Sequence, residues 1–127
     1  MANSATVLNS QLPIGYEKSQ AGIKTKQVKV VIDTTGADLT VYDPPADKHW
    51  AIIGLIYVET NAHTLTIKSQ STTLLDLELA ANSGIVHPIG NGVLLTSAVK
   101  GDDLIIQSSA AMGTMIFTIQ EFDYLRF

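Results

Sequence analysis

Two carboxylates, Asp76 and Glu78, have the residue type and spacing that acid–base chemistry requires. They stand two positions apart in TTLLDLELA, where leucines occupy the positions beside them. In an extended strand this spacing places both carboxylates on one face about 7 Å apart, within the range of paired glycosidase carboxylates. Such a pair would make the protein a hydrolase. Because catalytic carboxylates need unequal, partly desolvated surroundings, we expect Asp76 and Glu78 to be an ordinary solvent-facing pair.

Other arrangements that support catalysis or metal binding are missing from the sequence. The three histidines, His49, His63 and His87, are scattered and show no H-x-H spacing. Cysteine is absent, which excludes zinc ribbons, thiol nucleophiles and disulfide scaffolds. No serine lies in a G-x-S-x-G elbow, and no phosphate-binding glycine loop occurs. We therefore expect a protein that is not an enzyme and that binds no cofactor or metal.

Aromatic rings offer a different kind of site. Trp50, Tyr42 and Tyr57 would stack on a sugar if their rings were exposed, which keeps a carbohydrate-binding recognition module open as an alternative function. Trp50, however, begins a long apolar stretch, and we expect its ring to lie in the core.

The elements that must position these groups are predicted from the apolar residues, which recur with a period of two, as in β-strands. From residue 27 onward apolar and polar residues alternate, as in QVKVVID at 27–33 and HTLTIKS at 63–69, and turn signals recur about every ten residues. About eight strands in roughly a hundred residues favour an all-β fold, an antiparallel jelly-roll β-sandwich over residues 27–127. An immunoglobulin-like sandwich is the alternative.

The longest expected strand, HWAIIGLIYVE at residues 49–59, is apolar on both faces. Strict alternation turns Trp50, Ile56 and Val58 toward one face and Ile53, Leu55 and Tyr57 toward the other. The second set would then form an oligomer interface. The alternative is a β-bulge, signalled by Gly54, that shifts the register and returns part of this set to the core.

Residues 1–26 are expected to form an extended N-terminal arm, because Pro13, Gly15 and Gly22 interrupt a polar stretch. Residues 1–30 carry four lysines and one glutamate, a balance of +3, whereas residues 31–127 carry four basic and eleven acidic residues, a balance of −7. A basic arm suits an acidic surface on a neighbour, although a disordered tail is the alternative. The residues expected to contact a partner are Leu12, Ile14, Tyr16, Ile23, Lys24 and Lys26 in the arm and Ile53, Leu55 and Tyr57 in the long strand.

Charge and hydropathy also bear on partners. An acidic body repels a nucleic-acid backbone, so we expect no nucleic-acid partner. No stretch is long and apolar enough to span a bilayer, and the first residues lack a secretory signal, so we expect no membrane partner.

Three stretches resemble the small β-sandwich virion proteins of tailed phages, above all the head decoration, or cement, proteins. They are residues 50–58, GDDLIIQSS at 101–109 and TMIFTIQEF at 114–122, and the resemblance covers roughly residues 27–124. It implies a non-enzymatic protein on the capsid surface of a virion, made in the host cytoplasm. Its implied partners are the major capsid protein and further copies of itself, as a trimer. A tail-fibre protein remains the alternative within the recognition class.

Overall fold

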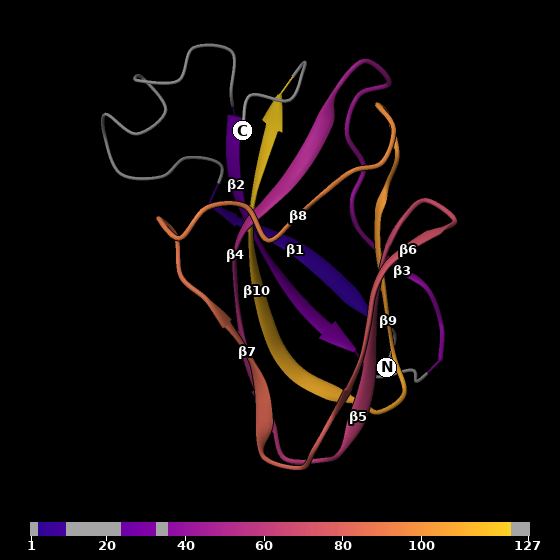
Figure 1. Ribbon diagram of the computed structural model, residues 1–127, viewed down its shortest axis with the longest axis vertical. Helices are drawn as coiled ribbons and strands as arrows, with labels where there is room; N and C mark the ends of the chain where they lie inside the picture. The colour runs from indigo at the N-terminus through magenta and orange to yellow at the C-terminus, as the bar shows by residue number, and fades with distance from the viewer. Residues whose placement is uncertain (1–2, 10–23, 33–35, 123–127) are drawn as a thin grey trace.

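The computed structural model describes residues 3–9, 24–32 and 36–122, which form strands and turns without a helix (Figure 1). The strands make two antiparallel sheets that pack face to face, so the predicted all-β antiparallel sandwich is confirmed. The strands of these residues are β1 (Ser4–Asn9), β2 (Lys24–Ile32), β3 (Leu39–Tyr42), β4 (His49–Glu59), β5 (His63–Ser69), β6 (Thr72–Leu79), β7 (Ser83–His87), β8 (Leu95–Thr96), β9 (Leu104–Ser108) and β10 (Met112–Phe122).

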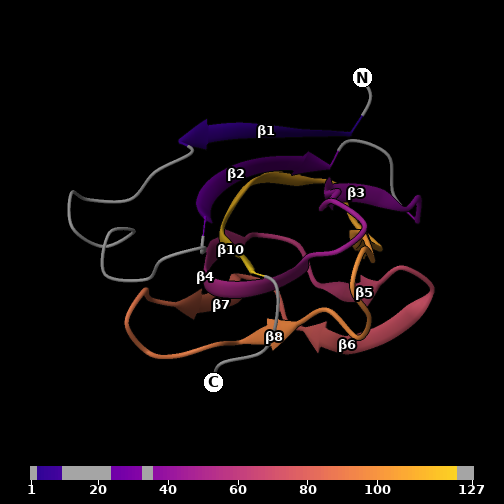
Figure 2. The ribbon, with the colours of Figure 1, turned by 90° about the horizontal axis from the view of Figure 1, so that it is seen from above.

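The two sheets interleave strands that are distant in the sequence. The larger sheet has the order β1-β2-β10-β4-β7, with β8 also paired to β4, and the smaller has the order β3-β9-β5-β6. In Figure 2, β1 and β3 lie at one edge of the sandwich and β6, β7 and β8 at the other. The chain crosses between sheets repeatedly, as from β2 to β3 and from β9 to β10, which is compatible with a jelly-roll winding.

Both sheets turn their apolar faces inward around Trp50. This side chain is fully buried, and its indole N–H donates a hydrogen bond to the Asp102 carbonyl oxygen at 2.9 Å. The expected core position of Trp50 is therefore confirmed. The alternation read from QVKVVID also holds, because Val28 and Val30 are buried while Lys29 between them is exposed. Burial of a valine side chain such as Val28 or Val30 contributes about 1.5–3 kcal/mol to folding.

A β-bulge interrupts β4 at its middle. In the pairing with β10, Thr118 lies opposite Gly54, but the next residue, Ile119, lies opposite Ile52. Ile53 is therefore an extra residue, and side chains change face across it. Gly54 suits this position because a Cβ would lie only 3.2 Å from the Thr118 Cβ. The bulge that Gly54 signalled in the sequence is confirmed.

The bulge reverses the predicted faces of the second half of β4. Leu55 and Tyr57 join Trp50 in the core cluster. Ile56 and Val58, which strict alternation placed in the core, are instead 53% and 68% exposed. The prediction that Leu55 and Tyr57 face outward is wrong, because strict alternation does not count the extra residue.

The sandwich begins earlier in the chain than residue 27. β1 runs antiparallel to β2, with Ala5 opposite Val30 and Val7 opposite Val28, and β2 itself begins at Lys24. β1 thereby supplies backbone partners to an edge of β2 that would otherwise be unpaired. The described parts of the expected arm, 3–9 and 24–26, thus lie in the sheet, and residues 10–23 lie outside the described residues.

Two glycines of the larger sheet are expected to differ in their tolerance of alanine. A Cβ on Gly84 would lie 2.0 Å from the Tyr57 carbonyl oxygen, which is backbone, whereas a Cβ on Gly54 would meet the Ile89 Cγ1 at 3.1 Å, a side-chain atom. Gly84→Ala must displace β7 from β4 and should lower the free energy of unfolding by about 1–3 kcal/mol. Gly54→Ala should cost less, because its Cβ would meet side-chain atoms of Ile89 and Thr118 at 3.1 and 3.2 Å, whereas the Gly84 Cβ would overlap backbone. Denaturant titration of both variants checks this order, and an equal or reversed order would contradict the pairing of Gly84 with β4.

Candidate partner interface

The outer face of the larger sheet carries an apolar patch where β4 pairs with β7. Ile56 lies directly opposite Val86, and their side chains are 53% and 65% exposed. Val58 lies opposite Gly84, which has no side chain to cover it, and is 68% exposed. Ile89, which follows β7, adds a side chain that is 42% exposed. We call Ile56, Val58, Val86 and Ile89 the β4–β7 patch.

A groove of about 270 Å³ adjoins the patch on the same face. Its lining includes Ile56 and Ile89 together with Ile116 and Thr118 of β10. Because Ile116 lies opposite Ile56, which lies opposite Val86, one apolar row crosses three neighbouring strands. The groove therefore extends the apolar surface from β7 toward the middle of the sheet.

A positive charge ends this row. On the far side of β10, Ile116 is paired with Lys29 of β2, whose side chain is exposed. An apolar surface with a charged residue at its rim is typical of protein contact sites, in which the centre is desolvated and the rim stays in water.

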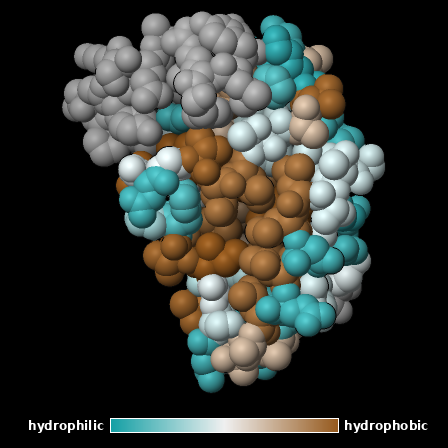
Figure 3. Space-filling model, in the orientation of Figure 1, coloured by the Kyte–Doolittle hydropathy of each residue, from teal (hydrophilic) through white to brown (hydrophobic). Residues whose placement is uncertain are grey.

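A second apolar surface follows the open edge of the sandwich between the last strands of the two sheets, β6 and β7. Figure 3 shows a broad hydrophobic area between the positions of these strands. Half-buried residues of β6, β7 and the segment at β8 pack against the core there: Leu75, Leu79, Ile85, Leu94 and Leu95. β7 takes part in both surfaces, because Ile85 packs inward against the core while Val86 belongs to the patch.

The residues predicted to contact a partner are distributed differently. Ile53, Leu55 and Tyr57 are only 5%, 1% and 4% exposed, so they do not form an outer surface of β4. Lys24 begins β2, opposite Glu121 of β10. The remaining arm residues lie outside the described residues: Leu12, Ile14, Tyr16 and Ile23.

Lys26 contributes to the interior instead of to an outer arm. Its Nζ donates a hydrogen bond to the Tyr42 hydroxyl at 3.3 Å and lies 4.9 Å from the centre of the Tyr42 ring. The Tyr42 hydroxyl in turn donates to the Glu121 carboxylate. Burial raises the pKa of Tyr42 well above its ordinary value, and the hydrogen bond and charge of Glu121 raise it further. Lys26, Tyr42 and Glu121 thus link β2 and β10 of one sheet to β3 of the other.

Tyr57 is held within the core by His63. The Tyr57 hydroxyl lies 3.3 Å from the His63 Nε2, and the two rings meet edge to face at 5.8 Å. The His63 Nδ1 lies 2.9 Å from the Asn61 carbonyl oxygen. Burial, and secondarily the Glu59 carboxylate, raises the pKa of Tyr57 from 10.0 to about 12.

The other histidines also have partners within the protein. The His49 Nδ1 lies 2.8 Å from the Ser97 Oγ, and the His87 Nε2 lies 3.0 Å from the Gly92 carbonyl oxygen. Within residues 3–9, 24–32 and 36–122, no three histidine or carboxylate side chains gather as metal ligands would.

The carboxylates considered for hydrolysis are both exposed on β6, an end strand of its sheet. Asp76 accepts a hydrogen bond from the Thr66 Oγ1 at 3.0 Å. Neither Asp76 nor Glu78 lines the groove beside the β4–β7 patch. The solvent-facing position expected for this pair is confirmed.

The three rings considered for sugar stacking are buried. Trp50, Tyr57 and Tyr42 are 0%, 4% and 8% exposed, so none offers a free face to a glycan. Recognition through these rings is therefore contradicted by their positions.

Strict alternation missed the side chains that do form the apolar patch. Ile56 and Val58 read as core positions, and the one signal against that reading was Gly54, which marked a bulge without fixing which residue was extra. Val86 lies in the short stretch GIVHPI, where its exposure depends on pairing with β4.

Comparisons with known proteins leave the family open. No protein-family model matches the chain, and no curated protein matches its sequence. A solved structure of a subunit from Bacillus endospore appendages, described as a family of disulfide-linked pili, aligns over 81% of this chain and 89% of that chain. Its TM-score is 0.48 and its identity 16%. None of the described residues forms a helix long and apolar enough to cross a membrane.

The raised pKa of Tyr57 predicts a loss of stability at alkaline pH. The folded state holds the hydroxyl proton up to about pH 12, whereas the unfolded chain releases it near pH 10.0. The stabilising contribution is therefore complete below pH 10 and is lost as pH rises toward 12, by about 2–3 kcal/mol in total. In Tyr57→Phe this part of the decline should vanish. Denaturation of both proteins at pH 9 and pH 11.5 measures the difference, and identical declines would show that Tyr57 is not buried in its protonated form.

Proposed function

We propose that this protein is a non-enzymatic structural protein of a virion, which decorates and stabilises a phage capsid. In this proposal it binds the major capsid protein and copies of itself, as a trimer. The observation that carries the proposal is the β4–β7 patch, in which four large apolar side chains stand in water on one face of a sheet. The capsid as the partner follows from the resemblance to head decoration proteins.

The patch favours a protein contact on energetic grounds. Covering the exposed half of each side chain would contribute about 1–2 kcal/mol, and the adjoining groove gives a partner side chain a place to enter. A stable interface covers about 800 Å² on each partner. β7 joins the patch to the open edge beside β6, so one partner lying along β7 would cover both surfaces.

The two outer faces of the sandwich differ in a way that suits a protein bound to a shell. The outer face of the larger sheet carries the patch and groove, with Lys29 at the end of the apolar row. The outer face of the smaller sheet carries Thr64, Thr66 and Gln107, with Asp76 and Glu78 exposed on β6. We assign the apolar face to protein contacts, with the capsid protein and with neighbouring copies of this chain. We assign the polar face to solvent.

Binding to the shell should depend on the patch. In the double variant Val58→Lys, Val86→Lys, two ammonium groups would have to be desolvated in the contact, so affinity for capsid shells lacking the decoration protein should fall at least about a hundredfold. Val99→Lys is the matched control, because Val99 is 61% exposed but lies outside the patch. Co-sedimentation of each protein with purified shells measures binding. Equal binding by the double variant would exclude the patch, and no binding by the unaltered protein would exclude the capsid.

A further inference from the structure

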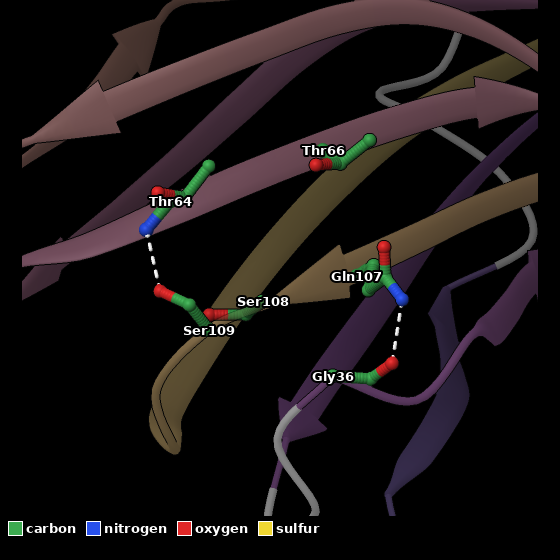
Figure 4. A pocket seen from close by; sticks show the side chains of 6 residues that line it. All are labelled: Gly36, Thr64, Thr66, Gln107, Ser108 and Ser109. Atoms are coloured by element: carbon green, nitrogen blue, oxygen red, sulfur yellow. Dashed lines mark hydrogen bonds between the residues drawn. The ribbon is translucent and has the colours of Figure 1, made fainter.

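The smaller sheet has a depression on its outer face that the proposed function does not use. It has a volume of about 260 Å³ and lies over β5 and β9 beside the turn at Gly36. Figure 4 shows Thr64 and Thr66 from β5 and Gln107 and Ser109 from β9 and the segment after it, arranged around an open centre. Thr66 lies directly opposite Gln107 in the strand pairing, so the sheet itself sets their spacing.

Hydrogen bonds hold some atoms of the lining residues in place, and other polar atoms of the same residues are free to bind a ligand. The Gln107 Nε2 donates to the Gly36 carbonyl oxygen, and the Ser109 Oγ accepts from the Thr64 backbone N–H at 2.7 Å. These bonds orient both side chains. Among the described residues, no hydrogen bond uses the Thr64 hydroxyl or the Gln107 Oε1. The depression therefore presents a hydroxyl that both donates and accepts and an amide oxygen that accepts.

The charges around the depression argue against an anionic ligand. None of its described lining residues is charged. Lys68, which follows Thr66 on the same side of β5, is paired with Asp38 at 2.9 Å. Asp76 stands beside the depression through its bond with Thr66, and Glu78 lies opposite Thr64 in the pairing with β6. Among the described residues, phosphate, sulfate or a carboxylate would therefore meet two carboxylates and no unpaired lysine on this face.

We propose that this depression binds a neutral saccharide ring. Sugar hydroxyls both donate and accept, so they can bond the Thr64 hydroxyl in either sense and donate to the Gln107 Oε1, and the carboxylate of Asp76 is placed to accept from a further hydroxyl at the rim. The volume lies just below the range typical of drug-sized ligands, so it suits one ring of a glycan. This site is independent of the β4–β7 patch, which lies on the other sheet.

Amide NMR titration with simple glycosides tests the site. The probes are the methyl glycosides of glucose, galactose and mannose, and N-acetylglucosamine, each added at millimolar concentration to the full chain. At least one should give saturable shifts at residues 64–66 and 107–109. Thr64→Val and Gln107→Ala should each weaken that binding about tenfold, as loss of one hydrogen bond predicts. Thr40→Val is the matched control, because Thr40 is exposed on the same face outside the depression.

Three results would overturn the proposal. The first is the absence of a saturable shift with all four probes, and the second is binding that Thr64→Val leaves unchanged. Thr64→Val keeps the shape of the side chain and removes no side-chain hydrogen bond among the described residues, so it stays informative even if Gln107→Ala disturbs the Gly36 turn. The third is tighter binding of sodium sulfate at the same amides, which would assign the depression to an anion. None of these results bears on capsid binding.

Discussion

The extra residue in β4 is the constraint on which the arrangement of this sandwich depends. β4 lies between β10 and β7 in the larger sheet, so its side chains reach both the core and the outer face. Because Ile53 has no partner of its own, Leu55 and Tyr57 enter the core and Ile56 and Val58 leave it. The apolar patch follows directly, since Gly84 opposite Val58 has no side chain to cover it.

Polar groups hold the two sheets together where apolar packing alone would leave their relative position open. Tyr42 of β3 reaches Glu121 of β10 and Lys26 of β2, and Trp50 of β4 reaches the carbonyl group of Asp102 beside β9. Each bond satisfies a group that burial would otherwise make costly. The two outer faces of this sandwich differ in chemistry, apolar over β4 and β7 and hydroxyl-bearing over β5 and β9.

The sequence alone predicted the features that depend on local pattern. Alternation in QVKVVID and HTLTIKS predicted strands with their faces, and both hold in β2 and β5. Gly54 predicted a bulge. The sequence of β4 alone does not show which side chains the bulge leaves exposed. That depends on which residue of β4 has no partner in β10, a strand more than sixty positions later in the chain.

The pairing of β1 with β2 and the polar depression were beyond local pattern for the same reason. SATVLN is short and precedes a polar stretch, so only the unpaired edge of β2 identifies it as a strand of the sheet. Thr64 and Gln107 are ordinary polar positions in their own strands. They form a site only because β5 and β9 are neighbours in the smaller sheet.

The oligomeric state of the unaltered protein tests most directly whether the β4–β7 patch is a contact surface. Light scattering coupled to size-exclusion chromatography at micromolar concentration measures it. We expect a mass above that of one chain, with a trimer as the assembly, and a return to one chain when Val58 and Val86 are both replaced by lysine. A strict monomer at every concentration would contradict the account.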